Sequence, residues 1–156
     1  MSGKASLPKP AAKRRVLIVD DHPLLRRGLA MLIRNESDLM VCAQVATHQA
    51  ALTAICRSEP GLVIADLALK DDNALGLIEE IHCRHPHLPV LVLTLHDEPL
   101  LAEGAFRAGA RGYLTKQEMG ETVLLAIRCL LGGRKYVSQR LNGSSRVLGP
   151  INSAPR

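Results

Sequence analysis

The stretch VLIVDDHP, residues 16–23, joins an apolar run directly to two aspartates, a histidine and a proline. Four consecutive apolar residues are typical of a strand that is covered on both faces of a sheet. Asp20 and Asp21 end this run, and Pro23 suits the first turn of a helix, where its missing N–H is not needed for an intrahelical hydrogen bond. The stretch therefore predicts a buried strand, a short acidic loop and a helix in immediate succession.

The same alternation of strand and helix recurs along the chain. The pattern predicts strands at 16–19, 41–46, 62–65, 90–94 and 112–114, and helices at 23–35, 47–57, 74–85, 99–108 and 121–131. Such alternation implies parallel strands, right-handed crossovers and helices on both faces of the sheet. We therefore expect an α/β fold, a flavodoxin-like three-layer sandwich with a five-stranded parallel sheet in the strand order 2-1-3-4-5.

Polar side chains follow four of the predicted strands at their carboxyl ends. They are Asp20 and Asp21, Asp66, Thr94 and Lys116. The carboxyl ends of parallel strands lie at one edge of the sheet, so we expect these side chains to share one pocket. Any one of them is explained equally well as the polar start of a loop, but the whole set is not.

These residue types point to phosphoryl transfer. Clustered carboxylates repel one another unless a cation binds, and oxygen ligands suit Mg²⁺. A carboxylate can also attack phosphorus and form an aspartyl phosphate. Lys116 would supply positive charge, and Thr94 a hydroxyl group, to the oxygens of the transition state.

Several stretches of the sequence resemble the receiver domain of two-component response regulators, which has the CheY-like fold. They are residues 16–23, Asp66 after its apolar strand, Leu93 with Thr94, and residues 108–116. The resemblance covers about residues 14–138. The Asp-His-Pro opening and the GRKYVS stretch at 133–138 are most similar to receivers that precede a LuxR-type helix-turn-helix, which implies a role in transcription regulation.

The resemblance implies a phosphoacceptor and a metal site. Asp66 would accept the phosphoryl group from a phosphohistidine on a sensor histidine kinase. Asp21 and Asp66 would ligate Mg²⁺ directly, together with the backbone carbonyl of Ala68, while Asp20 would hold a metal-bound water. The chain would then be a phosphoacceptor that loses its phosphoryl group slowly, and not an enzyme.

The resemblance also implies a switch. Lys116 would pair with the phosphoryl oxygens, Thr94 would move to hydrogen-bond them, and Tyr113 would rotate inward behind it. His96 would lie at the pocket mouth, where it would influence the access of water to the phosphoryl group. The added charge would bias a surface built from the fourth strand, the fourth helix and the fifth strand.

The sequence departs from the family after Asp66. Lys70, Asp71 and Ala74 stand where receivers usually carry Pro, Gly and Gly. We expect these differences to bear on kinase docking or on the lifetime of the phosphoryl group. Gln117 follows Lys116 where many receivers have Pro, although the LuxR-type class often lacks that proline. No active-site residue is lost.

The positive charge of the chain lies at its two ends. Ten of the 20 Lys and Arg fall in residues 1–15 and 134–156, which contain none of the 15 Asp and Glu. The middle therefore has a net charge of −5, although the whole chain has +5. We expect a basic disordered tail at 1–13, the receiver domain at 14–138 and a second basic tail at 139–156.

The second tail lacks the hydrophobic helical pattern of a DNA-binding domain. We therefore expect no output domain in this chain and no sequence-specific DNA binding by the chain alone. Two explanations stay open, a stand-alone receiver and a chain without its output domain. Any affinity for DNA would come from the basic tails and would fall steeply with salt.

Several other classes of protein are disfavoured. No apolar run approaches the ~20 residues that span a bilayer, and the first residues lack a signal-peptide pattern. We therefore expect a cytoplasmic protein with no membrane partner. The four cysteines form no C-x-x-C pair and lie in apolar stretches, which favours buried, reduced thiols. His82, His85 and His87 are better explained by a solvated helix end than by a metal site.

Three rival functions can be weighed against a phosphorylated signalling module. A phosphatase of the haloacid dehalogenase type needs a second Asp two residues after the nucleophile, where this chain has Ala68. A nucleotide or flavin binder would carry a glycine-rich loop after the first strand, and none is present. A degenerate receiver would act only as a binding surface and would not need the polar set described above. The presence of all five of these residues therefore argues against this function.

The last predicted helix, 121–131, suggests a contact surface. Its helical period turns most of the apolar residues toward the sheet but leaves Leu125 and Cys129 pointing outward beside Arg128. Such a pair is either two scattered surface residues or a contact site. We expect this face to form a homodimer on phosphorylation or to dock a missing output domain.

Overall fold

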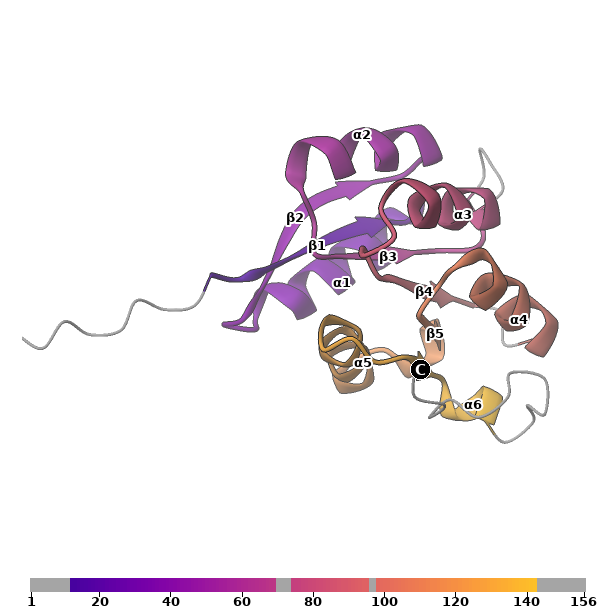
Figure 1. Ribbon diagram of the computed structural model, residues 1–156. Helices are drawn as coiled ribbons and strands as arrows, with labels where there is room; N and C mark the ends of the chain where they lie inside the picture. The colour runs from indigo at the N-terminus through magenta and orange to yellow at the C-terminus, as the bar shows by residue number, and fades with distance from the viewer. Residues whose placement is uncertain (1–11, 70–73, 96–97, 143–156) are drawn as a thin grey trace, which may run out of the picture.

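The computed structural model describes residues 12–69, 74–95 and 98–142, which form one sheet flanked by helices (Figure 1). The main elements, in chain order, are β1 (Arg14–Val19), α1 (Pro23–Arg34), β2 (Leu39–Val45), α2 (His48–Ser58), β3 (Leu62–Ala65), α3 (Ala74–Arg84), β4 (Val90–Thr94), α4 (Pro99–Ala108), β5 (Gly112–Thr115) and α5 (Glu121–Leu131). Three short elements complete the fold: a 3₁₀ turn η1 (Lys116–Glu118), β6 (Tyr136–Val137) and α6 (Gln139–Asn142). The predicted strand–helix alternation is thus confirmed.

The sheet has the strand order β2-β1-β3-β4-β5-β6, and every neighbouring pair is parallel. The predicted order 2-1-3-4-5 is confirmed, but the expected total of five strands is wrong. The sixth strand pairs Tyr136 with Gly112 and Val137 with Tyr113. A strand of two residues is too short to show the continuous apolar run by which the other strands are recognised.

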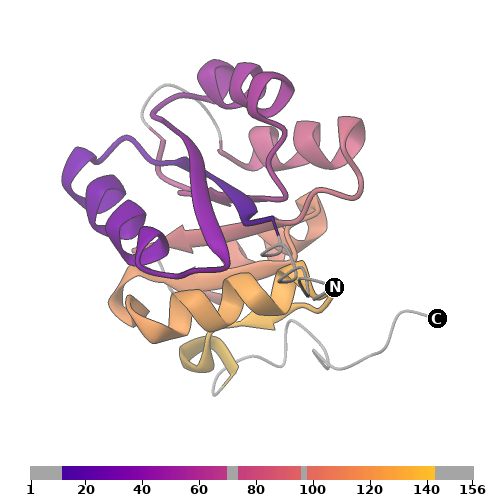
Figure 2. The ribbon, with the colours of Figure 1, turned by 90° about the vertical axis from the view of Figure 1, so that its left-hand side faces the viewer.

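Two hydrophobic cores lie on opposite faces of the sheet. Side chains of successive strand residues point to opposite faces, so Leu17 and Val19 join the core under α2, α3 and α4, while Val16 and Ile18 join the core under α1 and α5. Figure 2 shows α1 and α5 on one side of the sheet and α2 and α3 on the other. Both faces of the central strands are buried, as their continuous apolar sequences predict.

Local signals set the ends of several helices. Pro23 opens α1, and the Thr47 side chain accepts a hydrogen bond from the Ala50 N–H at the start of α2. α4 ends at Gly109, whose φ of 118° is unfavourable for other residues. A Cβ at this position would lie 2.5 Å from Cγ of His82, so glycine is also required for space.

The folded unit continues past the expected boundary at residue 138. Val137 and Leu141 are buried in the core under α2, α3 and α4, and α6 extends to Asn142. The expectation of a tail from 139 onward is therefore wrong for residues 139–142. The rest of that tail, residues 143–156, and nearly all of the first tail, residues 1–11, lie outside the described residues.

The cysteines differ from expectation. All four are free, but Cys56 and Cys83 are exposed, and Cys42 and Cys129 are half-buried. The prediction of buried thiols is wrong because their apolar neighbours in sequence occupy the buried positions. Within the described part of the chain, none of the helices has the length and apolar character needed to cross a membrane.

Candidate functional site

The predicted polar side chains lie at the carboxyl edge of the sheet. Asp20 and Asp21 directly follow β1, Asp66 follows β3, and Lys116 follows β5. Because β1 and β3 are neighbours, the three aspartates are brought together. Thr94 closes β4 and is paired in register with Thr115 at the end of β5.

Lys116 bridges two of the carboxylates. Its Nζ lies 2.9 Å from Oδ2 of Asp66 and 2.9 Å from Oδ2 of Asp20. All three side chains are buried. Burial by itself would lower the pKa of Lys116, but hydrogen bonds and charge attraction from Asp66 and Asp20 outweigh it, so the pKa is raised above its ordinary value. Lys116 is therefore held as a cation at neutral pH.

His22 also faces the carboxylates, a contact that the sequence analysis did not predict. Its Nδ1 lies 3.1 Å from Oδ1 of Asp20, 3.2 Å from Oδ1 of Asp21 and 3.6 Å from Oδ2 of Asp66. The sequence signal was the position of His22 directly after the two aspartates. The ring is partly exposed and lies at the solvent side of the cluster.

Backbone groups fix the orientation of the two buried carboxylates. Oδ1 of Asp20 accepts a hydrogen bond from the His22 N–H at 2.9 Å, and Oδ1 of Asp66 accepts one from the Ala68 N–H at 3.1 Å. The Arg26 guanidinium donates to the backbone carbonyl of Asp20 at 2.5 Å, which ties the first turn of α1 to the acidic loop. The spacing of Arg26 along the chain did not predict this contact.

The cluster has a donor set that fits a divalent cation. Ligand atoms of Asp20, Asp21, His22 and Asp66 all lie within 4.8 Å of one another. Among the described residues, the ammonium group of Lys116 contacts Asp20 and Asp66, and the His22 ring faces all three carboxylates. Clustered carboxylate oxygens are the donors that Mg²⁺ prefers in proteins.

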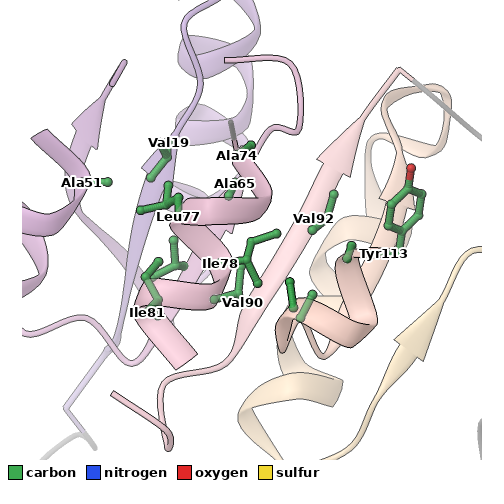
Figure 3. Close-up of a cluster of buried hydrophobic side chains, with 14 of the residues drawn as sticks. Val19, Ala51, Ala65, Ala74, Leu77, Ile78, Ile81, Val90, Val92 and Tyr113 are labelled. Atoms are coloured by element: carbon green, nitrogen blue, oxygen red, sulfur yellow. The ribbon is translucent and has the colours of Figure 1, made fainter. Parts of the chain in front are cut away.

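Two further predicted residues are buried close to this edge. Thr94 is inaccessible to solvent, and so is Tyr113, which pairs in register with Val92 and packs in the core under α3 and α4 (Figure 3). The Tyr113 ring is buried, and its inward rotation on phosphorylation stays a prediction. His96, Lys70 and Asp71 lie outside the described residues, and Ala74 is the buried first residue of α3.

The outward face of α5 is partly as predicted. Leu125 is 59% exposed, but Cys129 is half-buried and its thiol donates to the carbonyl of Lys135 at 3.5 Å. Arg128 bonds to Glu36 at 2.6 Å and to both carboxylate oxygens of Asp38, at 2.8 and 3.0 Å. The hydrogen bond from Arg128 lowers the pKa of Asp38. This face therefore presents one exposed leucine beside an ion-pair network.

Within the described residues, the histidines at the end of α3 do not form a metal cluster with other ligands. His82 and His87 are exposed and His85 is half-buried. The preferred interpretation of a solvated helix end agrees with these positions.

Comparison with protein families gives a match to the response regulator receiver domain over residues 16–128. Two similar curated proteins are the oxygen regulatory protein NreC of Staphylococcus haemolyticus, 31% identical over 132 residues, and the transcriptional activator protein ExaE of Pseudomonas putida, 35% identical over 126 residues. The matched parts cover 83% and 81% of this chain, and 60% and 59% of those proteins. The chain thus spans about three fifths of the length of these relatives.

A solved structure with a similar fold is that of a LuxR-family two-component response regulator from Aurantimonas sp. SI85-9A1. It is 30% identical to this chain, with a TM-score of 0.81. The match covers 85% of this chain and 94% of the other. The fold and the sequence therefore lead to the same group of proteins.

Proposed function

The chain belongs to the response regulator receiver domain family, and we propose that its Asp66 accepts a phosphoryl group from a phosphohistidine. The observation that carries this proposal is the bridge from Lys116 to Asp66 and Asp20, with Asp21 beside it. The Asp66 carboxylate thus contacts the ammonium group of Lys116 and also borders the cluster that could hold a divalent cation. This arrangement would lower the repulsion between a carboxylate and an approaching phosphate.

The transfer balances as a single displacement at phosphorus. A carboxylate oxygen of Asp66 forms the new O–P bond while the P–N bond of the phosphohistidine breaks. The electron pair of that bond stays on the imidazole nitrogen, so the donor leaves as a neutral imidazole and no oxidant or reductant is needed. Water later attacks the phosphorus of the acyl phosphate, the O–P bond to Asp66 breaks, and inorganic phosphate leaves while the carboxylate is restored. The chain thus serves as a phosphoacceptor with slow self-dephosphorylation, not as an enzyme with a separate substrate.

We assign the Mg²⁺ site to Asp21 and Asp66, with the backbone carbonyl of Ala68 and a water held by Asp20. The oxygen donors of the three aspartates fit this ion. When bound, Mg²⁺ supplies positive charge that neutralises phosphoryl oxygens. Lys116, whose Nζ lies 2.9 Å from Oδ2 of Asp66, would neutralise part of the remaining charge.

Thr94 and Tyr113 are assigned to the switch. The Thr94 hydroxyl would hydrogen-bond the phosphoryl group, and the movement would allow the Tyr113 ring to fill the space behind it. Both side chains are buried on neighbouring strands, which makes such coupled repacking feasible. The surface of β4, α4 and β5 would then change its shape.

The biological setting follows from the family and its relatives. Receivers of this family take phosphoryl groups from histidine kinases and often dimerise. We propose a cytoplasmic two-component system that controls transcription, since one relative is a transcriptional activator and a similar structure is a LuxR-family regulator. The absence of sequence-specific DNA binding by this chain alone stays a prediction.

A small phosphodonor tests the proposed function directly. The protein is incubated with acetyl phosphate and Mg²⁺, and bound phosphate is measured before and after acid and alkali treatment. An acyl phosphate should be retained at mild acid and lost in alkali or hydroxylamine. Phosphate that survives hydroxylamine, or no phosphate at all, would contradict the proposal.

Asp21→Ala is expected to weaken Mg²⁺ binding by at least about tenfold, and Asp20→Ala by less. The reason is that Oδ2 of Asp20 is already engaged by Lys116 and Oδ1 by His22, so this carboxylate has less capacity for a metal. Chemical shifts in an NMR titration with MgCl₂ measure both affinities.

Asp38→Ala is the matched control for the Mg²⁺ titration because Asp38 is an exposed aspartate far from the carboxyl edge of the sheet. Its affinity for Mg²⁺ should equal that of the wild type. Unchanged binding by Asp21→Ala would remove the direct-ligand role from Asp21.

Leu125→Glu is expected to prevent a phosphorylation-enhanced homodimer through α5. The exposed leucine lies near the charged side chains of Glu36, Glu121 and Arg128, so a carboxylate at this position should remove its apolar contact. Sedimentation velocity with and without beryllofluoride, a phosphoryl mimic, measures the dimer. Leu100→Glu, at a leucine of α4 that is 77% exposed, is the control and should still dimerise if the interface lies on α5. If Leu100→Glu instead blocks the dimer, the interface lies on α4.

A further inference from the structure

One carboxylate oxygen holds the turn after β5 and the last described segment of the chain together. Oε2 of Glu118 accepts hydrogen bonds from the N–H of Thr115 at 3.1 Å, from the Thr115 hydroxyl at 3.0 Å and from the Ser138 hydroxyl at 2.5 Å. Thr115 and Ser138 are far apart in sequence, and Glu118 is the group that joins them. The family site described above does not include this residue.

These donors are removed from water. Ser138 is 0% exposed and Thr115 is 1% exposed. A buried hydroxyl that loses its acceptor bears its full desolvation cost, and a charged acceptor makes the stronger hydrogen bonds. The contact from Glu118 to Ser138 is therefore one that the folded protein would lose only at a substantial cost.

Lys116 lies inside the turn that Glu118 closes. The two hydrogen bonds from Thr115 to Glu118 span the three-residue 3₁₀ turn η1, of which Lys116 is the first residue. The backbone of Lys116 is thus fixed between Thr115 and Glu118, while its ammonium group reaches Asp66 and Asp20. A change in the position of this turn would move the cation at the phosphoacceptor.

Ser138 lies at the junction of β6 and α6. Its N–H donates to the carbonyl of Tyr113 at 2.8 Å, and its own carbonyl accepts from the N–H of Leu141 at 3.0 Å. Since β6 has two residues, its ladder to β5 is short. The Ser138 hydroxyl therefore adds a side-chain hydrogen bond to the short ladder and to the core contacts of Val137 and Leu141, which together attach residues 136–142 to the rest of the domain.

We propose that Glu118 is a positioning residue that couples the phosphoacceptor site to the segment 136–142. A phosphoryl group on Asp66 gives the ammonium of Lys116 further acceptors and restrains the turn 116–118. Glu118 transmits this restraint to Ser138, so that β6 and α6 become more firmly attached. The inference rests on the proposed function of Asp66 and adds a route from that site to the C-terminal segment.

Coupling of this kind must act in both directions. If ligand binding at Asp66 stabilises the attachment of residues 136–142, a variant that weakens this attachment must lower the affinity of the site for the ligand by the same factor. A single hydrogen bond of ordinary net strength corresponds to a factor of roughly three to ten. Both quantities can be measured on the intact chain with beryllofluoride and Mg²⁺.

The test is hydrogen exchange of the amides in residues 136–142, with and without beryllofluoride and Mg²⁺. In the wild type, exchange is expected to slow by roughly three- to tenfold on addition of the mimic. In Ser138→Ala, exchange in residues 136–142 should be faster than in the wild type, and it should not change when beryllofluoride and Mg²⁺ are added. The affinity of Ser138→Ala for beryllofluoride should be lower than that of the wild type. The expected factor equals the ratio of the wild-type exchange rates measured without and with beryllofluoride.

Two further variants separate coupling from general loss of stability. Glu118→Gln keeps an acceptor oxygen and should retain most of the response, whereas Glu118→Ala should lose it. Thr53→Ala removes a hydroxyl that bonds to Gln49 on exposed α2, and it should behave as the wild type. If Ser138→Ala does not fold, the comparison of Glu118→Gln with Glu118→Ala decides the question.

The outcomes distinguish the inference from the function on which it rests. If the wild type does not bind beryllofluoride, the proposed function and the inference are both overturned. If the wild type binds it but residues 136–142 show no change in exchange, the inference alone is overturned. The same holds if Ser138→Ala or Glu118→Ala keeps the full wild-type response.

Discussion

Asp66→Asn is expected to reduce phosphorylation by acetyl phosphate by at least about 100-fold. The amide has nearly the shape of the carboxylate but is a far weaker nucleophile, and it brings no negative charge to the metal site. The variant should remain folded, because it removes the charge of one of three clustered carboxylates, which repel one another. The rate is measured by intact mass after timed incubation with acetyl phosphate and Mg²⁺.

Asp38→Asn is the matched control for Asp66→Asn. Asp38 is exposed and bonded to Arg128, at a distance from the acidic cluster, so this variant should gain phosphate at the wild-type rate. If Asp66→Asn gains phosphate as readily as the control does, the phosphoacceptor is another residue. A peptide map after borohydride trapping would then locate it.

The sheet was predictable because its strands are buried on both faces. A run such as that of β1 contributes Leu17 and Val19 to one core and Val16 and Ile18 to the other, so every position must be apolar. A strand of this type is recognised from the sequence without knowledge of its partners. The order of the five predicted strands is that of the flavodoxin-like doubly wound fold, which the short connections and the alternation of strand and helix favour.

The C-terminal elements were not predictable by the same means. β6 and α6 bury Val137 and Leu141, and two apolar residues four positions apart make no recognisable period. What holds them is tertiary: the ladder to β5 and the hydrogen bond from Ser138 to Glu118. Residues 139–142 therefore resemble a polar tail in composition although they are part of the domain.

The position of the candidate site was predictable, but its contacts were not. Asp20, Asp66 and Lys116 could be placed at one edge because each follows a strand of a parallel sheet. The contacts of His22 with the carboxylates and of Arg26 with the Asp20 backbone depend on how α1 lies against the loop. Spacing along the chain does not contain that information.

The face of α5 shows the limit of helical periodicity. The period placed Leu125 and Cys129 on the outer side, yet the Cys129 thiol is turned toward the backbone of Lys135. Arg128 was placed beside them, but its bonds to Glu36 and Asp38 join α5 to the turn between α1 and β2. A helical wheel gives the direction of a side chain and not the group that it meets.

Lys116→Met is expected to change two properties of the site in opposite directions. Its ammonium lies 2.9 Å from Oδ2 of both Asp20 and Asp66, where it competes with a metal ion for the same charge. Removing it should therefore raise the affinity for Mg²⁺ by roughly tenfold. The same change removes a cation from the phosphoryl oxygens in the transition state, which should slow phosphorylation by about 100-fold.

The opposed signs make Lys116→Met more informative than a variant that loses both properties. The raised pKa of Lys116 indicates that hydrogen bonds and charge attraction from Asp66 and Asp20 favour its charged form. Methionine keeps most of the buried length without the charge, and Lys135→Met, at an exposed lysine, is the matched control. NMR titration with Mg²⁺ and timed acetyl phosphate labelling measure the two effects separately. If Lys116→Met binds Mg²⁺ more weakly than the wild type, the lysine orders the carboxylates and does not compete with the ion. If the labelling rate is unchanged, Lys116 does not contact the phosphoryl oxygens in the transition state.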